Sequence, residues 1–80
     1  MGSIEDLVQQ FENNPQNVGF NDLCRVCKHY FGKGRIKSSH HIYKTPWQGD
    51  PRINIQDDNG KAKAYQVRQV VKAIKKLEGI

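Results

Sequence analysis

The feature that most constrains the fold of this chain is an uninterrupted amphipathic stretch close to its C-terminal end. Between residues 64 and 78 the apolar side chains recur at helical spacing, and no glycine or proline interrupts them. They are Val67, Val70, Val71, Ile74 and Leu77. This spacing predicts a helix with one apolar stripe. Because that stripe must be covered, the preceding residues have to supply a second apolar surface.

Two shorter helices are predicted before this one. The apolar positions of the first, over residues 3–13, are Ile4, Leu7, Val8 and Phe11, and those of the second are Leu23, Val26, Cys27 and Tyr30. Ser3 and Asn21 are of the residue types that cap helix N-termini, so we expect the two helices to begin there. Gly32 and Gly34, on either side of Lys33, are expected to end the second helix.

The residues between these helices and the last one are predicted to be extended. Residues 35–45 are rich in β-branched and aromatic side chains, and Ser38-Ser39 indicates a bend between two short strands. A loop at residues 46–51, a strand at 52–56 and a turn at 57–60 follow. The order predicts an α+β fold with a small antiparallel three-stranded sheet. Its helices pack on one face and leave the other face for a ligand.

Eighty residues are enough for one small core, so residues 1–80 are expected to form a single domain. The sequence has neither an apolar run long enough to span a bilayer nor the apolar region of a signal peptide. Its two cysteines are too few for a secreted disulfide scaffold. These features predict a cytoplasmic protein with no membrane partner.

Charge is distributed unevenly along the chain. Residues 1–22 have a net charge of −4, whereas residues 23–80 contain all thirteen Lys and Arg residues and have a net charge of +9. An excess of this size favours a polyanionic partner. A solvated surface that only keeps the protein in solution would have the same composition, so charge alone does not decide between the two.

The basic part contains two adjacent histidines, His40 and His41, flanked by Arg35, Lys37 and Lys44. Histidine can both accept and donate a proton near neutral pH. Cations beside it attract phosphate groups. This combination indicates chemistry on a phosphodiester, and RNA is the simplest such substrate for a small basic protein.

Three segments together resemble the HicA family of mRNA-cleaving toxins from bacterial and archaeal toxin–antitoxin systems. They are Ser39-His40, the strand Arg52–Ile55, and Lys63–Val70 at the start of the last helix. The likeness covers residues 20–78, and residues 1–19 are an N-terminal helical extension to it. The resemblance implies a fold like a double-stranded-RNA-binding domain and an endoribonuclease that needs no metal or other cofactor. It also implies inhibition by a HicB-type antitoxin protein.

By this resemblance the catalytic histidine of the family falls on His40, and the serine that precedes it falls on Ser39. Cleavage beside a 2′-hydroxyl needs a group that removes its proton and cations that stabilise the phosphorane, which are roles for a histidine among lysines. The glycine of the family motif is replaced by Ser38. Glycine allows a close backbone approach or an unusual φ, so this replacement affects either the site or the backbone.

Several other residues are candidates for RNA contact. Arg35, Lys37 and Lys44 are expected to bind phosphate or to form an ordinary solvated strand edge. Trp47, in a polar loop, is a candidate platform for base stacking, whereas Tyr43 is expected to be buried against a helix. On the last helix Arg68 and Lys72, followed by Lys75 and Lys76, are expected to follow an RNA backbone or to meet an acidic antitoxin. His41 should face away from His40, as a surface or packing residue, and would be a second proton-transfer group only if a bulge at Ser39-His40 re-aimed it.

Cys24 and Cys27 have the spacing of half a zinc site, but the chain has no second pair. His29, His40 and His41 would complete a site only if the fold brought them together. On a helix Cys27 lies in the apolar stripe, where a free thiol packs as a small hydrophobe. We therefore expect no metal, and a disulfide between the two remains the other interpretation.

Two alternatives to a ribonuclease fit the same residues. A non-catalytic RNA-binding module would use the cations, survive the loss of His40 and bind RNA in a salt-dependent way. A protein-interaction module would dock a partner on its sheet face and last helix. The sequence does not identify the second proton-transfer group or the RNA sequence that is cut.

Overall fold

The structure, a computed structural model, describes residues 3–49 and 52–79. The helices are α1 (Ile4–Asn13), α2 (Phe20–Phe31) and α3 (Ala64–Leu77), and the strands are β1 (Arg35–Lys37), β2 (His40–Lys44), β3 (Arg52–Asp58) and β4 (Lys61–Ala62). The chain is therefore an α+β fold, as predicted. The end of the predicted loop at residues 46–51 lies outside the described residues.

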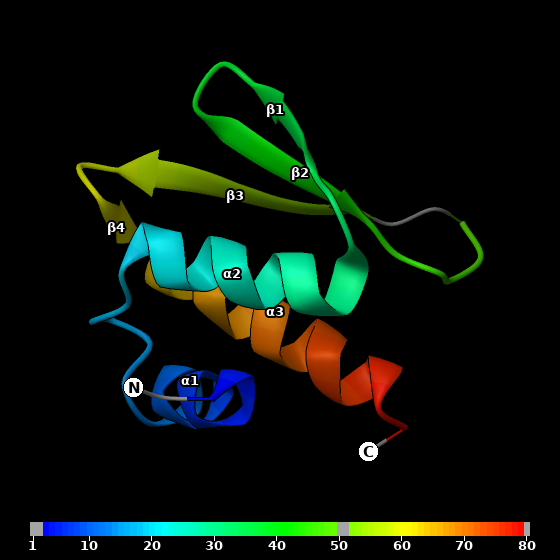
Figure 1. The fold of residues 1–80 in the computed structure, drawn as a ribbon, viewed down its shortest axis with the longest axis horizontal. Coiled ribbons are helices and arrows are strands. Elements are labelled where there is room, and N and C mark those ends of the chain that lie inside the picture. Colours follow the sequence, from blue (N-terminus) through cyan, green and yellow to red (C-terminus); the bar gives the residue numbers. More distant parts are fainter. Residues whose placement is uncertain (1–2, 50–51, 80) are drawn as a thin grey trace.

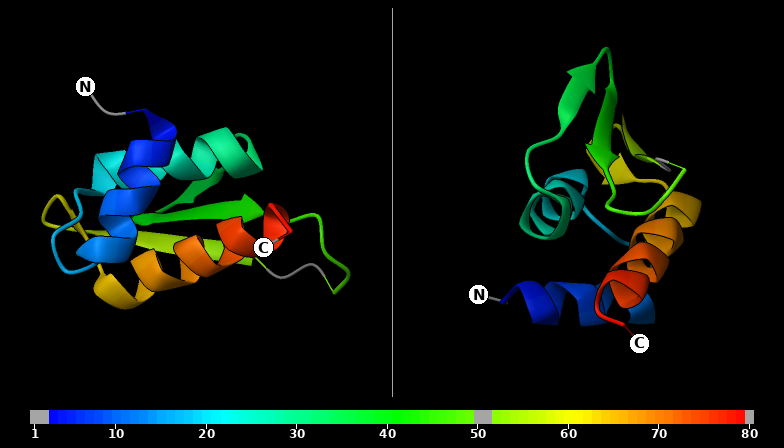
Figure 2. Two further views of the ribbon diagram at one scale, coloured as in Figure 1. Left: turned by 90° about the horizontal axis from the view of Figure 1, so that it is seen from below. Right: turned by 90° about the vertical axis from the view of Figure 1, so that its right-hand side faces the viewer.

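The elements form layers (Figure 1). The sheet is one layer, α2 and α3 lie side by side against one of its faces, and α1 lies beneath that pair, on the side away from the sheet. Figure 2 shows the same arrangement from below and from the side. All three helices of the described ranges thus lie on one side of the sheet, which leaves the other face open, as the sequence predicts.

Over the described residues the sheet has four strands in the order β1-β2-β3-β4, all antiparallel, so the prediction of three strands is wrong. The additional strand is β4, which pairs with the end of β3 through a turn at Asn59-Gly60. Both turn residues have a positive φ, of 54° and 85°, which is the geometry of a type I′ hairpin. An Asn-Gly pair is the strongest short signal for such a hairpin, so the sequence contained the evidence for this strand.

The two predicted N-caps differ in outcome. Ser3 caps α1, and a complete capping box joins it to Asp6. The prediction for α2 is wrong, because this helix begins at Phe20 with Gly19 as its N-cap and not at Asn21. Gly19 is held in extended backbone by a bridge to Lys61, and the Phe20 amide donates to the Gly60 carbonyl. The pairing with β4 therefore fixes where α2 starts.

The core lies between the sheet and the α2–α3 pair. The fully buried side chains are Leu23, Val26 and Cys27 of α2, Ile55 of β3, and Val67, Val70 and Ile74 of α3. Leu7 and Phe11 of α1 close the same core from the other side. Burial of one such side chain is worth roughly 1.5–3 kcal/mol. The apolar stripes predicted for all three helices are therefore the faces that hold the layers together.

The search for membrane-spanning segments covers the described ranges. It finds no helix that is both long and apolar enough to cross a bilayer.

Candidate nucleic-acid interface

The register of the strands determines which side chains share the open face of the sheet. His40 stands directly across from Lys37 on β1 and from Gln56 on β3, and Ile42 stands across from Arg35 and Asn54. Directly opposed residues point to the same side of a sheet. The open face therefore carries Arg35, Lys37, His40, Ile42, Lys44, Arg52, Asn54 and Gln56. The intervening positions of β2 and β3, Tyr43, Ile53 and Ile55, are buried against the helices.

His40 makes a defined contact on this face. Its Nδ1 atom lies 2.9 Å from Oδ1 of Asn54. An amide oxygen can only accept a hydrogen bond, so the contact holds the imidazole proton on Nδ1. Nε2 is then the proton acceptor of the ring. Asn54 thus fixes both the tautomer and the orientation of His40.

The hairpin that presents His40 has a two-residue loop, Ser38-Ser39, between the paired residues Lys37 and His40. Ser38 has a φ of 58°, in the left-handed region that favours glycine, whereas Ser39 is not among the residues with positive φ. A positive φ at the first loop residue alone is the pattern of a type II′ turn, in which glycine is usual there. The backbone conformation at Ser38 is therefore one in which glycine would be favoured.

Ser39 lies at the end of the same turn, exposed to solvent. Its Oγ accepts a hydrogen bond of 3.5 Å from Nε2 of Gln56, the residue opposite His40. The Ser39 carbonyl also accepts from the Asp57 amide at 3.4 Å. Ser39 is therefore tied to β3 and lies beside His40 along the rim of the open face.

Cations share the sheet face of His40, and Lys37 stands directly across from it. The predicted phosphate contacts all lie on this face and are exposed: Arg35, Lys37 and Lys44. Arg52 also lies on this face and is exposed. A pocket of about 290 Å³ lies among Arg35, Lys37, Ile42 and Arg52. Among the strand residues described, Asp58 is the only carboxylate on this face, and it stands across from Lys61. The open face therefore suits an anion.

The opposite side of β2 is occupied by packing. His41 meets the Phe20 ring edge-on, with 4.9 Å between ring centroids, and its Nδ1 lies 3.6 Å from Sγ of Cys24. Tyr43 is buried, as expected, and burial raises its pKa. The same cause raises the pKa of the Cys24 thiol. His41 is therefore a packing residue, as the alternation along the strand predicts.

Cys27 is fully buried in the core of α2, and burial raises its pKa to about 12. Both cysteines are free thiols. Within residues 3–49 and 52–79, no group of three or more His, Cys, Asp or Glu side chains is placed to hold a metal ion. Cys27 is thus a core residue, and the structure does not bring His29 and His40 together with it.

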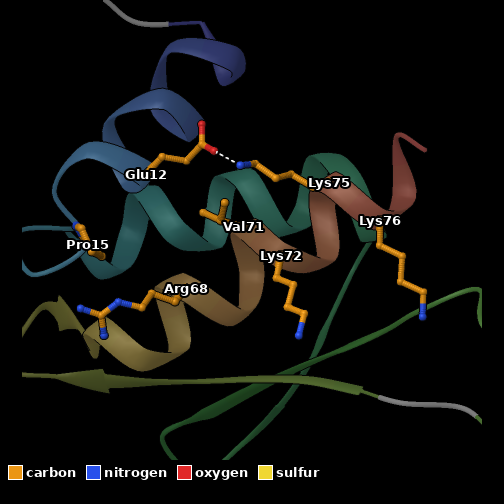
Figure 3. Close-up of a pocket in the computed structure, with 7 residues that line it drawn as sticks. All are labelled: Glu12, Pro15, Arg68, Val71, Lys72, Lys75 and Lys76. Carbon is orange, nitrogen blue, oxygen red and sulfur yellow. Dashed lines mark ion pairs between the residues drawn. The ribbon is translucent and has the colours of Figure 1, made fainter. Parts of the chain in front are cut away.

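Trp47, Arg68 and Lys72, also predicted to contact RNA, lie away from His40. Trp47 belongs to the β2–β3 loop, and Nζ of Lys76 lies 4.5 Å from its ring centroid. Arg68 and Lys72 line a hollow of about 830 Å³ between α1 and α3, shown in Figure 3. The structure therefore divides the predicted contacts into a sheet group around His40 and a helix group on α3.

Sequence reasoning missed three residues of the open face: Arg52, Asn54 and Gln56. They alternate with the buried Ile53 and Ile55, so their shared face was readable from the sequence. Their position beside His40 was not, because it depends on how β2 and β3 are aligned. Asn54 is the most important of the three, since it holds the imidazole.

The chain matches no protein-family model, no curated protein and no solved structure in the comparisons made. The fold and the site define a small α+β domain whose open sheet face presents one oriented histidine among cations.

Proposed function

We propose that this protein is an endoribonuclease that cleaves mRNA without a metal ion, with His40 as its catalytic acid or base. The observation that carries the proposal is the placement of His40 on an open, cationic sheet face with its Nδ1 atom held by Asn54. Nε2 is then the atom that can accept a proton from a bound hydroxyl. The resemblance of Ser39-His40 and the flanking elements to the HicA family supports the same reaction.

The proposed reaction uses these positions. Nε2 of His40 removes the proton of a ribose 2′-hydroxyl, and the 2′-oxygen attacks the adjacent phosphorus. The bond from phosphorus to the 5′-oxygen breaks, that oxygen takes up a proton from water as it leaves, and His40 returns its proton to the solvent. The products are a 2′,3′-cyclic phosphate and a 5′-hydroxyl. Because DNA lacks the 2′-hydroxyl, the reaction is specific for RNA.

The neighbouring cations supply electrostatic stabilisation. Lys37 stands directly across from His40, within reach of the same phosphate. Arg35 and Arg52 line the pocket beside it. Negative charge grows on the non-bridging oxygens as the phosphorane forms, so cations fixed there lower the barrier. Ser39, tied to Gln56 at the rim, is the second residue that we assign to the site.

The resemblance extends the proposal to a biological role. The protein would be the toxin of a type II toxin–antitoxin system, acting in the cytoplasm on mRNA and inhibited by a HicB-type antitoxin. The same resemblance implies that the core has a fold of the double-stranded-RNA-binding type. An antitoxin with an acidic surface would inhibit by covering the cationic face around His40.

The test is cleavage of a mixed RNA in EDTA by the wild-type chain and by His40→Ala, with His29→Ala as a matched control. His29 is an exposed histidine on α2, outside the open face. Cleavage to 2′,3′-cyclic phosphate ends by the wild type and by His29→Ala, but not by a folded His40→Ala chain, is the expected result. Equal cleavage by all three would reject His40.

The second candidate is a non-catalytic RNA-binding module, which the cations of the open face would serve equally well. It predicts that none of the three chains cleaves RNA and that all bind it with equal, strongly salt-dependent affinity. Growth arrest by the expressed wild type but not by His40→Ala would exclude it.

A further inference from the structure

Three hollows on the surface adjoin one another and share cationic side chains. The first, of about 290 Å³, is lined by residues of β1, β2 and β3 and includes Lys37, the residue opposite His40, and Arg52. The second, of about 340 Å³, lies around Trp47 and includes Arg52, Lys72 and Lys76. The third, of about 830 Å³, lies between α1 and α3 and again includes Lys72 and Lys76. Each hollow shares at least one residue with the next, so they form a continuous surface.

The structure assigns this surface to one ligand: we propose that a single strand of RNA runs from the His40 face over Arg52 and Trp47 and on along α3 to Lys72 and Lys76. We call this surface the basic track. The basic track rests on the proposed function, because it begins at His40. It adds that the RNA is single-stranded and that its contact with the protein extends as far as α3.

The edge of the sheet leaves room for such a path. β4 pairs only with Asp57 and Asp58, at the far end of β3. Arg52, at the start of β3, is therefore bordered by the Trp47 loop and α3 and not by β4. In Figure 3, Lys72 and Lys76 point away from Glu12, whereas Lys75 points toward it and forms an ion pair with it. Glu12 therefore neutralises Lys75 and neither lysine of the track, and Lys76 lies over the Trp47 ring.

The geometry favours RNA over an acidic protein, and a single strand over a duplex. The track passes from one face of the molecule around its edge to the helix side, and the whole molecule measures 32 × 31 × 21 Å. Smooth bending of a 20–30 base-pair DNA duplex through 40–90° costs about 1–6 kcal/mol, and a flexible single strand follows the edge without this cost. Cations interleaved with an aromatic ring are what binds a single strand. Trp47 supplies the ring, with Lys76 beside it.

The experiment uses the His40→Ala chain, so that RNA is bound and not cut. Its probes are fluorescein-labelled oligouridylates of about 4 and about 12 nucleotides, a short and a long length within the site sizes of about 4–16 nucleotides found for single-strand binders. Fluorescence anisotropy over a range of salt gives the affinity and the number of phosphate contacts. Trp47 is the only tryptophan of the chain, so its intrinsic fluorescence reports contact with the middle of the track.

Added to His40→Ala, the changes Lys72→Gln and Lys76→Gln are expected to weaken binding of the longer probe at least tenfold and to leave the shorter probe unaffected. The slope of log K against log salt should fall by about 1.4, which is about 0.7 for each lost phosphate contact. Only the longer probe should change Trp47 fluorescence. The matched control is Lys28→Gln with Lys33→Gln, an equal loss of charge in a pocket on the α2 side of β1. That pocket shares Ile36 with the first hollow but includes none of Arg52, Lys72 and Lys76.

An equal effect of the two double variants would overturn the track, because binding would then depend on net charge alone. If the variant with Lys72→Gln and Lys76→Gln bound the longer probe as tightly as its parent, the track would also be overturned. An acidic protein would then be the expected partner of the α3 surface. The cleavage test on His40 is independent of these measurements. A chain that binds along the track and cuts no RNA would reject the ribonuclease and retain the track.

Discussion

Nδ1 of His40 and Oδ1 of Asn54 lie 2.9 Å apart across two neighbouring strands, and this contact orients the histidine to which we assign the chemistry. The two residues are 14 positions apart in the sequence. They do not stand directly opposite each other, since Asn54 is paired with Ile42. The contact is therefore a diagonal one, made on the face of the sheet that the helices leave open.

Asn54→Ala is expected to slow RNA cleavage while leaving the fold intact. Without its acceptor, the Nδ1 proton of His40 is no longer fixed and the ring can rotate. We expect a loss of roughly tenfold to a hundredfold in kcat, a share of the about 10²–10⁴-fold that a positioned acid or base contributes. Single-turnover cleavage at saturating enzyme measures this loss.

Asn54→Asp is the second variant, and its carboxylate should move the acid limb of the pH–rate profile to higher pH by stabilising the imidazolium. A purely structural role would leave that profile unchanged.

Ser38→Gly is expected to stabilise the protein. Ser38 occupies the left-handed region at a φ of 58°, where a side chain costs about 1–2 kcal/mol. Part of this is offset by the greater freedom of glycine in the unfolded chain, so the net gain should be about 0.5–1 kcal/mol. Urea denaturation measures the change. Ser39→Gly is the matched control, and it should destabilise, because Ser39 has no positive φ to relieve. A gain of the same size for both would contradict the argument.

Gly34→Ala is expected to destabilise the protein strongly. A Cβ atom at Gly34 would stand 2.6 Å from Cε2 and 2.8 Å from Cδ2 of the Tyr43 ring, and 3.0 Å from the Ile42 carbonyl oxygen. Tyr43 is buried, so its ring has little room to move, and overpacking of this kind costs about 1–3 kcal/mol.

Gly19→Ala provides the comparison for Gly34. Its Cβ would meet nothing closer than 3.7 Å, at Oδ2 of Asp22, so only the modest preference for glycine at an N-cap is lost. Thermal unfolding of the two variants should separate them clearly. Equal melting temperatures would show that Tyr43 yields to the added methyl group.

The stability of the protein is expected to fall as the pH rises above about 9. Burial raises the pKa of Cys27 from 9.0 to about 12, so the folded state keeps this proton over a range in which the unfolded state releases it. The contribution of the thiol is fully present below the unfolded pKa and is lost as the pH rises through that range. The slope is at most about 1.4 kcal/mol per pH unit for this group.

Urea denaturation at pH 8 to 10, for the wild type and for Cys27→Ala, measures this slope. The variant is less stable at every pH because it leaves a cavity, but its stability should fall less steeply. Cys24 and Tyr43, whose pKa values burial also raises, remain in both chains and account for the slope that is left. Identical slopes would exclude Cys27 as the source.

Much of the fold was readable from the sequence because the information is local. Helical spacing of Val67, Val70 and Ile74 required a buried stripe, and all three are fully buried. Alternation of Ile53 and Ile55 with polar residues required a strand with one covered face. One wrong prediction also concerned local information. The turn at Asn59-Gly60 was predicted, but the strand β4 that follows it was not.

The start of α2 at Phe20 and the surroundings of His40 were decided by pairing between distant segments. Gly19 meets Lys61, and His40 meets Asn54, only once the strands are aligned. A side-chain period of two assigns residues to faces, but it does not say which neighbour each will have. The sequence by itself therefore determined three amphipathic helices, a sheet with one open face, and a histidine among cations. The tertiary structure decided which amide holds that histidine and that its cations continue around the sheet edge to α3, because strand register and helix packing are properties of the whole chain.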